Sequence, residues 1–427
     1  MRLTPVLRSA GACILLSVSV CGGDWPQYRG PHHNGISDER IGNWPEGGAK
    51  LRWKTPMNAG FSSITIADGV AATLVLREKD GVQREHVMAL DTNTGKELWA
   101  APLSVAKYDN GGDSGAPDNK GGDGPRSTPT IDAGNVFVFD GKLNLYCFDA
   151  KTGQQKWTKD LVAEHHGKVI SWQNAASPVI EGELIFAACG GPDESLLGID
   201  KNTGKTIWKG ESDAITHASP TVGAVLGQQQ VIFFTQKGLV SCEPGTGKVL
   251  WRYPFKYSVS TAASPIIAGD IVYCSAGYGV GAGAAKISKA GDTWTATEIW
   301  RETGNKIANH WSTPIYRDGY LYGMFQFKEY SAGALKCVDV KSGKEVWSQP
   351  NFGPGNVTLV GDKLVALTDA GDLVLINPNS EKYLELARFN AVKGKCWSTP
   401  SVAEGRIYVR SVKEGACYDV GARLSLR

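Results

Sequence analysis

One sequence pattern recurs along most of the chain and constrains its fold more than any other feature. An acidic residue is followed four positions later by glycine and eight positions later by tryptophan, as in Asp91-Thr-Asn-Thr-Gly-Lys-Glu-Leu-Trp99. Further copies end at Trp157, Trp208, Trp251, Trp347 and, in a looser form, Trp300. A worn copy, Asn377 to Phe389, has lost the tryptophan. The tryptophans follow one another at intervals of about 43 to 58 residues, which indicates a propeller or a similar array of short strands.

A second pattern marks the beginning of each unit. A serine-proline element precedes a run of β-branched and aromatic residues, and the stretches 61–68 and 355–362 are degenerate versions of it. The complete elements are Ser127-Thr-Pro129, Ser177-Pro178, Ser219-Pro220, Ser264-Pro265, Ser312-Thr-Pro314 and Ser398-Thr-Pro400. Apolar alternation, as in Val136-Phe-Val-Phe139, fits about four strands per unit, with Gly and Asp in the turns. The sequence therefore predicts eight such units.

The last unit, Trp397 to Val420, offers three good strands and lacks the fourth. Leu51-Arg-Trp53, near the start of the chain, matches the missing strand. We therefore expect 49–56 to pair with the last unit, with the tail 423–427 as its competitor. The predicted fold is an all-β, eight-bladed β-propeller of four-stranded antiparallel blades, closed by the N-terminal strand so that no sheet edge stays open. The predicted domains are a signal peptide (1–23), an N-terminal extension (24–50) and the propeller (51–427).

The repeated tryptophans are interpreted as wedges between neighbouring blades, and Trp53 is counted among them. One blade cannot bury its own faces, and a buried indole removes roughly 150–250 Å² from water, a gross gain of about 4–6 kcal/mol. Cys147, Cys337 and Cys417 each stand two residues before an aspartate, in a column that elsewhere holds Ala89 and Gly198. The residues at this position of the repeat have only their small size in common. We therefore interpret these cysteines as buried free thiols rather than as partners in a disulfide.

The first residues are typical of an export signal. Arg2 and Arg8 flank the apolar run 10–20, which is too short to span a membrane, and cleavage after Gly23 starts the mature chain at Asp24. In the alternative interpretation, the signal ends before Cys21 and this cysteine carries a lipid anchor. Lys plus Arg total 45 and Asp plus Glu 43, so without the signal the charges balance, which argues against a nucleic-acid partner. We expect an exported, periplasmic or secreted protein without a transmembrane segment, and a monomer.

These motifs resemble the quinoprotein-like (PQQ-repeat) β-propeller superfamily over about Leu51 to Val420. The opening Asp24-Trp-Pro-Gln-Tyr-Arg-Gly-Pro31 is similar to the start of many exported propellers of this group. The resemblance implies two kinds of relative. Dehydrogenases that use pyrroloquinoline quinone (PQQ) oxidise alcohols or sugars in the periplasm, whereas BamB-like lipoproteins are scaffolds for outer-membrane protein assembly. Fold alone does not choose between them.

In such propellers, the loops that lead into the innermost strands face the central funnel. Here those loops carry Arg126, Trp172, Gln173, Asn174, His217, His310, Trp311, Lys395, Cys396 and Trp397. Hydrogen-bonding groups mixed with aromatic rings suit a small polar or aromatic ligand, and the two histidines can act as acid or base near neutral pH. The alternative is a set of polar side chains that cap strands and line a wet channel. The Asp- and Gly-rich loop 108–126 is either a calcium-binding segment or, as its spacing favours, a solvated insertion.

The first functional hypothesis is a binding or scaffold module for a protein, a glycan or a small ligand at the funnel. The alternative is a PQQ-dependent periplasmic alcohol, polyol or sugar dehydrogenase, with calcium beside the quinone; a hydrolase or lyase at the funnel histidines is a third. The chain lacks an adjacent cysteine pair and a haem-attachment motif, two features of the large quinoprotein dehydrogenases. No cofactor is certain, PQQ with calcium being the candidate, and no residue is assigned as a metal ligand or catalyst.

Overall fold

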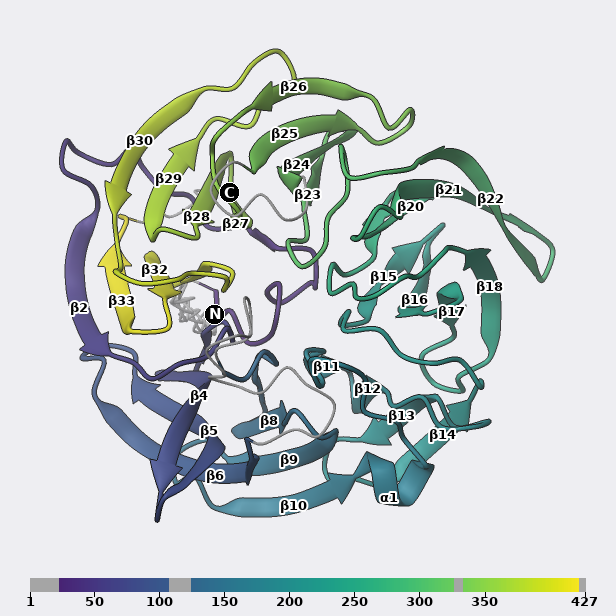
Figure 1. Ribbon diagram of the computed structural model, residues 1–427, viewed down its shortest axis with the longest axis horizontal. Coiled ribbons are helices and arrows are strands. Elements are labelled where there is room, and N and C mark those ends of the chain that lie inside the picture. The colour runs from purple at the N-terminus through teal and green to yellow at the C-terminus, as the bar shows by residue number, and fades with distance from the viewer. Residues whose placement is uncertain (1–22, 107–123, 326–332, 422–427) are drawn as a thin grey trace, which may run out of the picture.

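The computed structural model describes residues 23–106, 124–325 and 333–421. They form eight antiparallel sheets around a central axis, as Figure 1 shows. The predicted eight-bladed β-propeller is therefore confirmed. In the described part of the chain, no helix combines the length and the hydropathy needed to cross a bilayer.

Blades 1 to 4 follow one another in the first half of the chain. Blade 1 contains β3 (Thr65–Ala67), β4 (Val70–Lys79), β5 (Val82–Asp91) and β6 (Glu97–Val105). Blade 2 contains β7 (Thr130–Asp132), β8 (Asn135–Phe139), β9 (Asn144–Asp149) and β10 (Gln155–Asp160), followed by the short helix α1 (Leu161–His165). Blade 3 contains β11 (Val179–Glu181), β12 (Leu184–Ala188), β13 (Leu196–Asp200) and β14 (Thr206–Gly210). Blade 4 contains β15 (Thr221–Val225), β16 (Gln228–Thr235), β17 (Gly238–Cys242) and β18 (Val249–Pro254).

Blades 5 to 8 complete the ring. Blade 5 contains β19 (Ile266–Ala268), β20 (Ile271–Ala276), β21 (Gly281–Ala290) and β22 (Thr293–Glu302). Blade 6 contains β23 (Ile315–Arg317), β24 (Tyr320–Phe325), β25 (Ala334–Asp339) and β26 (Glu345–Gln349). Blade 7 contains β27 (Gly355–Val360), β28 (Lys363–Thr368), β29 (Asp372–Ile376) and β30 (Glu385–Asn390), with β1 (Ile36–Ser37) added. Blade 8 contains β31 (Ser401–Ala403), β32 (Arg406–Arg410), β33 (Glu414–Asp419) and β2 (Lys50–Pro56).

Strand β2 closes the ring from the N-terminal side. It pairs antiparallel with β33, and the register places Trp53 opposite Cys417 and Lys54 opposite Ala416. The expected role of 49–56 as the fourth strand of the last blade is thus confirmed. The competing tail 423–427 and nearly all of the signal 1–23 lie outside the described residues.

Each repeat tryptophan except Trp251 packs against the turn of the following blade. A methyl group on the Cα of Gly153 would lie 2.5 Å from the ring of Trp99 in the preceding blade, and one on Gly95 would lie 2.6 Å from Trp53. The indole N–H groups of Trp53 and Trp99 each donate to a carbonyl oxygen of that same turn, at 2.9 Å. The turn glycine is required because its φ is positive, 70° at Gly153, and because any side chain would displace the indole. The expected wedge role is confirmed.

The third strand supplies a small residue under each indole. The register shifts by one residue just before the tryptophan, a β-bulge that leaves the indole opposite a small partner. These partners are Ala89, Cys147, Gly198, Ser241, Ala284, Cys337 and Cys417. The described cysteines are free and buried, as expected, and burial raises the pKa of the Cys147 thiol to about 12.

Two blade interfaces depart from the repeat. Blade 5 replaces the Asp-x-x-Thr-Gly turn with the long hairpin β21–β22, which projects from the ring in Figure 1, and Trp251 donates instead to Gln230 Oε1 of its own blade at 2.7 Å. In blade 7 the register puts Ala387, not Phe389, at the tryptophan position, opposite the large Leu375. Phe389 packs two residues further on, against Gly48 beside the ring closure. In this degenerate repeat, an aromatic side chain still packs between the blades, but it is Phe389, two residues beyond the usual tryptophan position.

The segment 24–49, which we term the strap, crosses one end of the central channel before it enters β2 (Figure 1). Trp25 forms an antiparallel bridge with Ile66 of blade 1, and Pro26 accepts from the N–H of Ile131 in blade 2 at 2.7 Å. The buried Arg29 donates to the carbonyl oxygens of Thr313 and Pro314 in blade 6, both at 3.0 Å. Strand β1 then pairs parallel with β27, and Glu39 accepts from Gly405 of blade 8.

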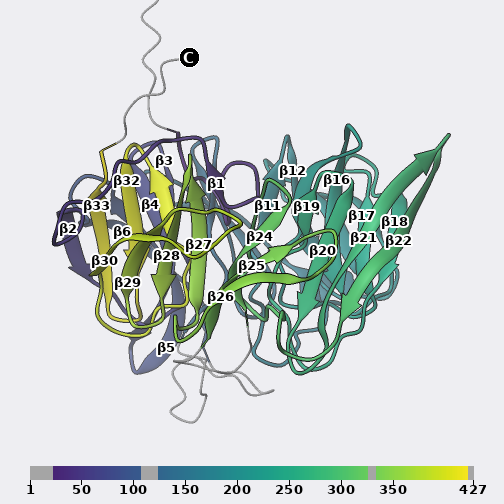
Figure 2. The same cartoon turned by 90° about the horizontal axis from the view of Figure 1, so that it is seen from above.

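The strap distinguishes the two faces of the ring. Because the strands of a blade alternate in direction, the turns between first and second strands lie at the strap face, whereas the loops between blades lie at the opposite face, which we term the funnel face. The side view of Figure 2 shows β1 toward one face and the β4–β5 hairpin extending beyond the other. The sequence-predicted site residues all stand in loops between blades and so belong to the funnel face.

Two glycines of blade 2 test the docking of the indole. Gly153 and Gly134 have similar positive φ values, 70° and 74°, but only Gly153 lies under an indole, and nothing lies within 4 Å of a methyl group on Gly134. Both substitutions to alanine incur the backbone penalty, and Gly153→Ala must also displace Trp99. We expect Gly153→Ala to lower the free energy of unfolding by roughly 1–3 kcal/mol more than Gly134→Ala. Urea unfolding checks this, and equal losses would contradict the wedge.

Candidate functional site

Three predicted residues from blades 2 to 4 meet on one side of the funnel face. Arg126 Nη1 donates to the carbonyl oxygen of Trp172 at 3.0 Å. Trp172 and Gln173 both have φ of 63°, a left-handed conformation that costs energy for side chains of this size. His217 Nε2 lies 2.8 Å from the carbonyl oxygen of Ser171, which ties the same loop to blade 4.

The contacts of His217 fix its tautomer. A carbonyl oxygen can only accept, so Nε2 carries the proton, and Nδ1 accepts from the hydroxyl of Ser260 at 3.0 Å. Burial, with the charge of Arg126 beside it, lowers the pKa of His217 to about 4. The imidazole is therefore neutral at neutral pH and joins two loops, which differs from the expected titration near neutrality.

A stack of three aromatic rings forms the other side. Trp397 lies between Phe61 and Trp311, with ring centroids 4.8 Å and 4.7 Å apart and interplanar angles of 22° and 21°. The rings come from blades 8, 1 and 6, and Lys395 Nζ lies 5.5 Å from the centroid of Trp397. The N–H of Phe61 donates to Pro125 at 2.8 Å, which links the stack to the segment that carries Arg126. Phe61 was not foreseen, because its first-strand element is degenerate.

The remaining predicted residues have other surroundings. His310 packs edge-on against Tyr278, with ring centroids 5.3 Å apart, and its backbone carbonyl accepts from Ala262 and Ala263. The side chain of Asn174 is buried and bonds to the carbonyls of Asp140 and Ala176 and to the N–H of Ala176. This loop-capping role corresponds to the alternative that the sequence left open. Cys396 is fully buried.

Asp369 is a funnel-face residue that the sequence did not reveal. It lies in the β28–β29 turn, where its carbonyl oxygen accepts from Cys396, and Lys395 is among its electrostatic partners. Burial raises the pKa of this carboxyl group to about 6. Its Asp-Ala-Gly sequence is typical of an ordinary turn, so only the fold could identify it.

The described residues do not fit a PQQ–calcium centre. Residues 107–123, most of the proposed calcium loop, lie outside them. Across the parts of the chain that the structure does describe, no three His, Cys, Asp or Glu side chains gather as a metal-binding group. Arg126 and Lys395 could meet the carboxylates of a quinone, but the three stacked rings are in contact and leave no slot between them for a planar ring. We therefore derive no chemical step through the quinone.

Comparison with known proteins places this geometry in context. A family model described as outer membrane protein assembly factor BamB matches residues 83–322 and 331–420. BamB of Shewanella oneidensis is 22% identical over 298 residues, which cover 66% of this chain and 71% of that protein.

Solved structures show the same fold. The crystal structure of BamB from Moraxella catarrhalis superposes with a TM-score of 0.57 at 14% identity, covering 87% of this chain and 99% of that one. Quinohemoprotein alcohol dehydrogenase from Comamonas testosteroni gives a TM-score of 0.66 at 14% identity, covering 95% and 81%. At this identity the likeness concerns the fold alone.

The carboxyl group of Asp369 predicts a pH dependence of stability. Its folded-state pKa of about 6 lies above the ordinary 3.8, so the folded protein is penalised once the carboxyl ionises. That penalty is absent below the unfolded pKa, grows as the pH rises from about 4 to 6, and is then constant. We expect Asp369→Asn to raise the melting temperature at pH 7.5 and to have little effect at pH 4. A difference that is the same at both pH values would contradict the assignment.

Proposed function

The chain belongs to the family described as outer membrane protein assembly factor BamB, and from that premise we propose that it is an exported propeller that binds a protein partner at its funnel face. Two observations support the proposal. The family is described as a factor of outer membrane protein assembly, and the first residues of this chain have the pattern of an export signal.

The asymmetry of the ring is the observation that carries the proposal. The strap occupies one mouth of the channel, whereas the opposite mouth carries the half-buried rings of Trp311 and Trp397 with Lys395 and Asp369 beside them. Tryptophan is enriched among the residues that contribute most of the binding energy at protein interfaces. Loops that a rigid scaffold holds in place are also where binding residues concentrate.

The stack is organised before any partner arrives. Trp397 is held on both faces, by Phe61 and by Trp311, so these side chains lose little conformational freedom on binding. Apolar side chains of a partner would pack against Trp311, and Lys395 and Asp369 would orient its polar groups. An ordered aromatic surface of this kind suits a loop or an extended segment of another protein.

A pair of truncations tests this proposal. Trp311→Ala removes the outer ring of the stack, whereas Leu98→Ala removes a side chain that is 48% exposed on the outermost strand of blade 1. We expect quantitative affinity purification from the native host to recover a partner equally with the wild type and Leu98→Ala. We expect roughly tenfold lower recovery with Trp311→Ala. Equal recovery with all three proteins would place the partner elsewhere and contradict the proposal.

A second experiment separates this proposal from a quinone-dependent dehydrogenase. Purified protein is mixed with PQQ and calcium and then desalted, and the retained quinone absorbance and the reduction of a dye with simple alcohols are measured. Because the rings of Phe61, Trp397 and Trp311 are already stacked on one another, we expect no retained quinone. Retention that Trp397→Ala abolishes would overturn the binding proposal in favour of an oxidoreductase.

A further inference from the structure

The innermost strand of every blade directs at least one peptide N–H toward the ring axis. In an antiparallel pair, successive residues point alternately toward the partner strand and away from it, and the pair that flanks each tight hairpin turn is hydrogen-bonded. The peptide N–H of the residue before that pair on the inner strand therefore points toward the axis. In the longer strand β15, the N–H of the residue two positions earlier also points toward the axis. The equivalent inward residues are Ile66, Ile131, Ile180, Val222, Ile267, Tyr316, Leu359 and Val402.

The strap supplies acceptors to four of these N–H groups. Ile66 donates to the carbonyl of Trp25 at 2.9 Å, Ile131 to that of Pro26 at 2.7 Å, and Leu359 to that of Gly35 at 3.0 Å. The N–H of Ile180 donates to the side-chain oxygen of Gln27 at 3.2 Å. Blades 1, 2 and 3 thus receive one strap residue each. The strap then crosses to blade 6 through Arg29 and passes over blades 4 and 5.

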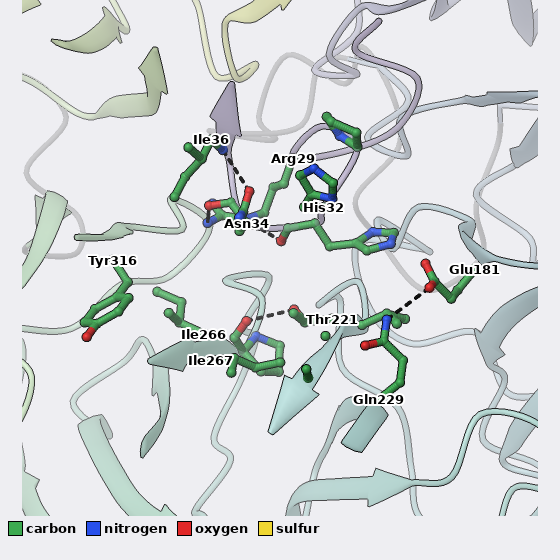
Figure 3. Close-up of a pocket in the computed structure, with 16 residues that line it drawn as sticks. Arg29, His32, Asn34, Ile36, Glu181, Thr221, Gln229, Ile266, Ile267 and Tyr316 are labelled. Atoms are coloured by element: carbon green, nitrogen blue, oxygen red, sulfur yellow. Dashed lines mark hydrogen bonds between the residues drawn. The ribbon is translucent and has the colours of Figure 1, made fainter. Parts of the chain in front are cut away.

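A cavity of about 370 Å³ remains where the strap passes over these blades. In Figure 3, Arg29, His32 and Asn34 of the strap stand across the cavity from Thr221, Ile266 and Ile267 of blades 4 and 5. Val222, Ile267 and Tyr316 also line it, and their inward N–H groups have no acceptor within the described residues. The cavity therefore presents donors of the same kind that the strap satisfies with oxygen atoms elsewhere.

The charge of the wall also favours an acceptor. The guanidinium of Arg29, only 3% exposed, is bonded to backbone carbonyl oxygens and, within the described residues, to no carboxylate. Glu181 is the opposing charge in the wall, and its Oε1 accepts from the amide of Gln229 at 3.0 Å. Within the described residues, the buried guanidinium therefore forms no ion pair, and Glu181 is the anion that shares the cavity wall with it.

His33 is buried and adds one more donor. Gln27 Oε1 accepts from Ile180, so the amide nitrogen of Gln27 donates to His33 Nε2, at 3.3 Å. The proton of the neutral imidazole then lies on Nδ1, for which the described residues offer no acceptor. Burial lowers the pKa of His33 to about 4, which keeps the ring neutral.

We propose that this cavity binds a small organic carboxylate, whose oxygen atoms accept from the peptide N–H groups of Val222 and Ile267 and whose charge is balanced by Arg29. A carboxylate offers about four acceptor positions, and convergent backbone N–H groups are a common anion-binding arrangement. Ile36 and Tyr316 provide apolar surface for the body of the ligand. The site lies on the strap face, opposite the funnel, and does not depend on a protein partner.

Acetate, succinate and citrate are the probes, each titrated calorimetrically into the purified chain. We expect saturable binding of at least one of them and a rise in melting temperature with its concentration. The uncharged diamide of succinate keeps the carbonyl groups but lacks the charge, and we expect it not to bind. Absence of binding by all three carboxylates, or equal binding of the diamide and succinate, would overturn the proposal.

A matched pair of proline substitutions tests the peptide donors. Val222→Pro removes the inward N–H in the cavity. Val402→Pro removes the equivalent N–H of blade 8, which lies outside the cavity and has no acceptor among the described residues. Both valines are buried and both N–H groups point away from the ladder. We expect Val222→Pro to weaken carboxylate binding roughly tenfold and Val402→Pro to leave it unchanged. Unaltered binding by Val222→Pro would overturn the proposal.

Glu181→Gln provides a test that does not depend on how the strands tolerate proline. Glu181 is exposed, so the substitution preserves the fold, and it removes the negative charge that opposes the ligand. We expect carboxylate binding to tighten about threefold, more at low salt than at high salt. Weaker or unchanged binding would contradict the assignment of the cavity to an anion.

Discussion

The contact between an indole and the glycine of the next blade is the interaction on which the ring depends. A four-stranded blade has two apolar faces and covers neither of them alone. The bulge and the small residue on the third strand together direct each tryptophan toward the following turn. In blade 1, for example, Trp99 lies opposite Ala89, which occupies the position that Cys147 has in blade 2. Because Gly153 has no side chain, the indole of Trp99 can reach that turn. The hydrogen bond from the indole N–H to the carbonyl oxygen of Ala150 then fixes the angle between the blades. Repetition of one such angle sets the number of blades that closes the circle.

Closure makes a demand on the chain that the other interfaces do not. Blade 8 is assembled from both ends of the propeller, so Trp53 must arrive from the N-terminal side to pack on Gly95. The buried Arg410 reinforces this junction by donating to Leu74 and Asn58 of the first blade's side. The strap contacts the inner strand of blade 1 at Trp25 and reaches blade 6 at Arg29 before β2 joins the outer edge of blade 8. The segment that closes the ring therefore also covers one end of the channel.

The sequence predicted the fold well because each repeat is a local signal that tolerates no other geometry at the turn. It predicted the location of the funnel loops for the same reason, since topology alone puts them on one face. It did not predict what depends on neighbours in space. Three features arise from residues that are distant in sequence. They are the pairing of the small Ala387 with the large Leu375, the stacking of Phe61 on Trp397 and the desolvation of Asp369. Side-chain direction, as at Asn174, is likewise decided by the loop that forms around it.

A propeller brings the inner edge of every blade to a common axis, and each edge is an unpaired strand. Exposed edges are normally covered, and a small ring leaves little room in which to do so. One strap can bond to every inner strand only while its own backbone spacing matches the spacing of the blades. The match holds from Trp25 to Gln27, fails over blades 4 and 5, and returns at Gly35 beside blade 7. Where the match fails, donors are left facing a cavity that the fold itself has shaped. Closing the ring with its own N-terminal segment therefore gives the two faces different chemistry, with aromatic surface on one and peptide donors on the other.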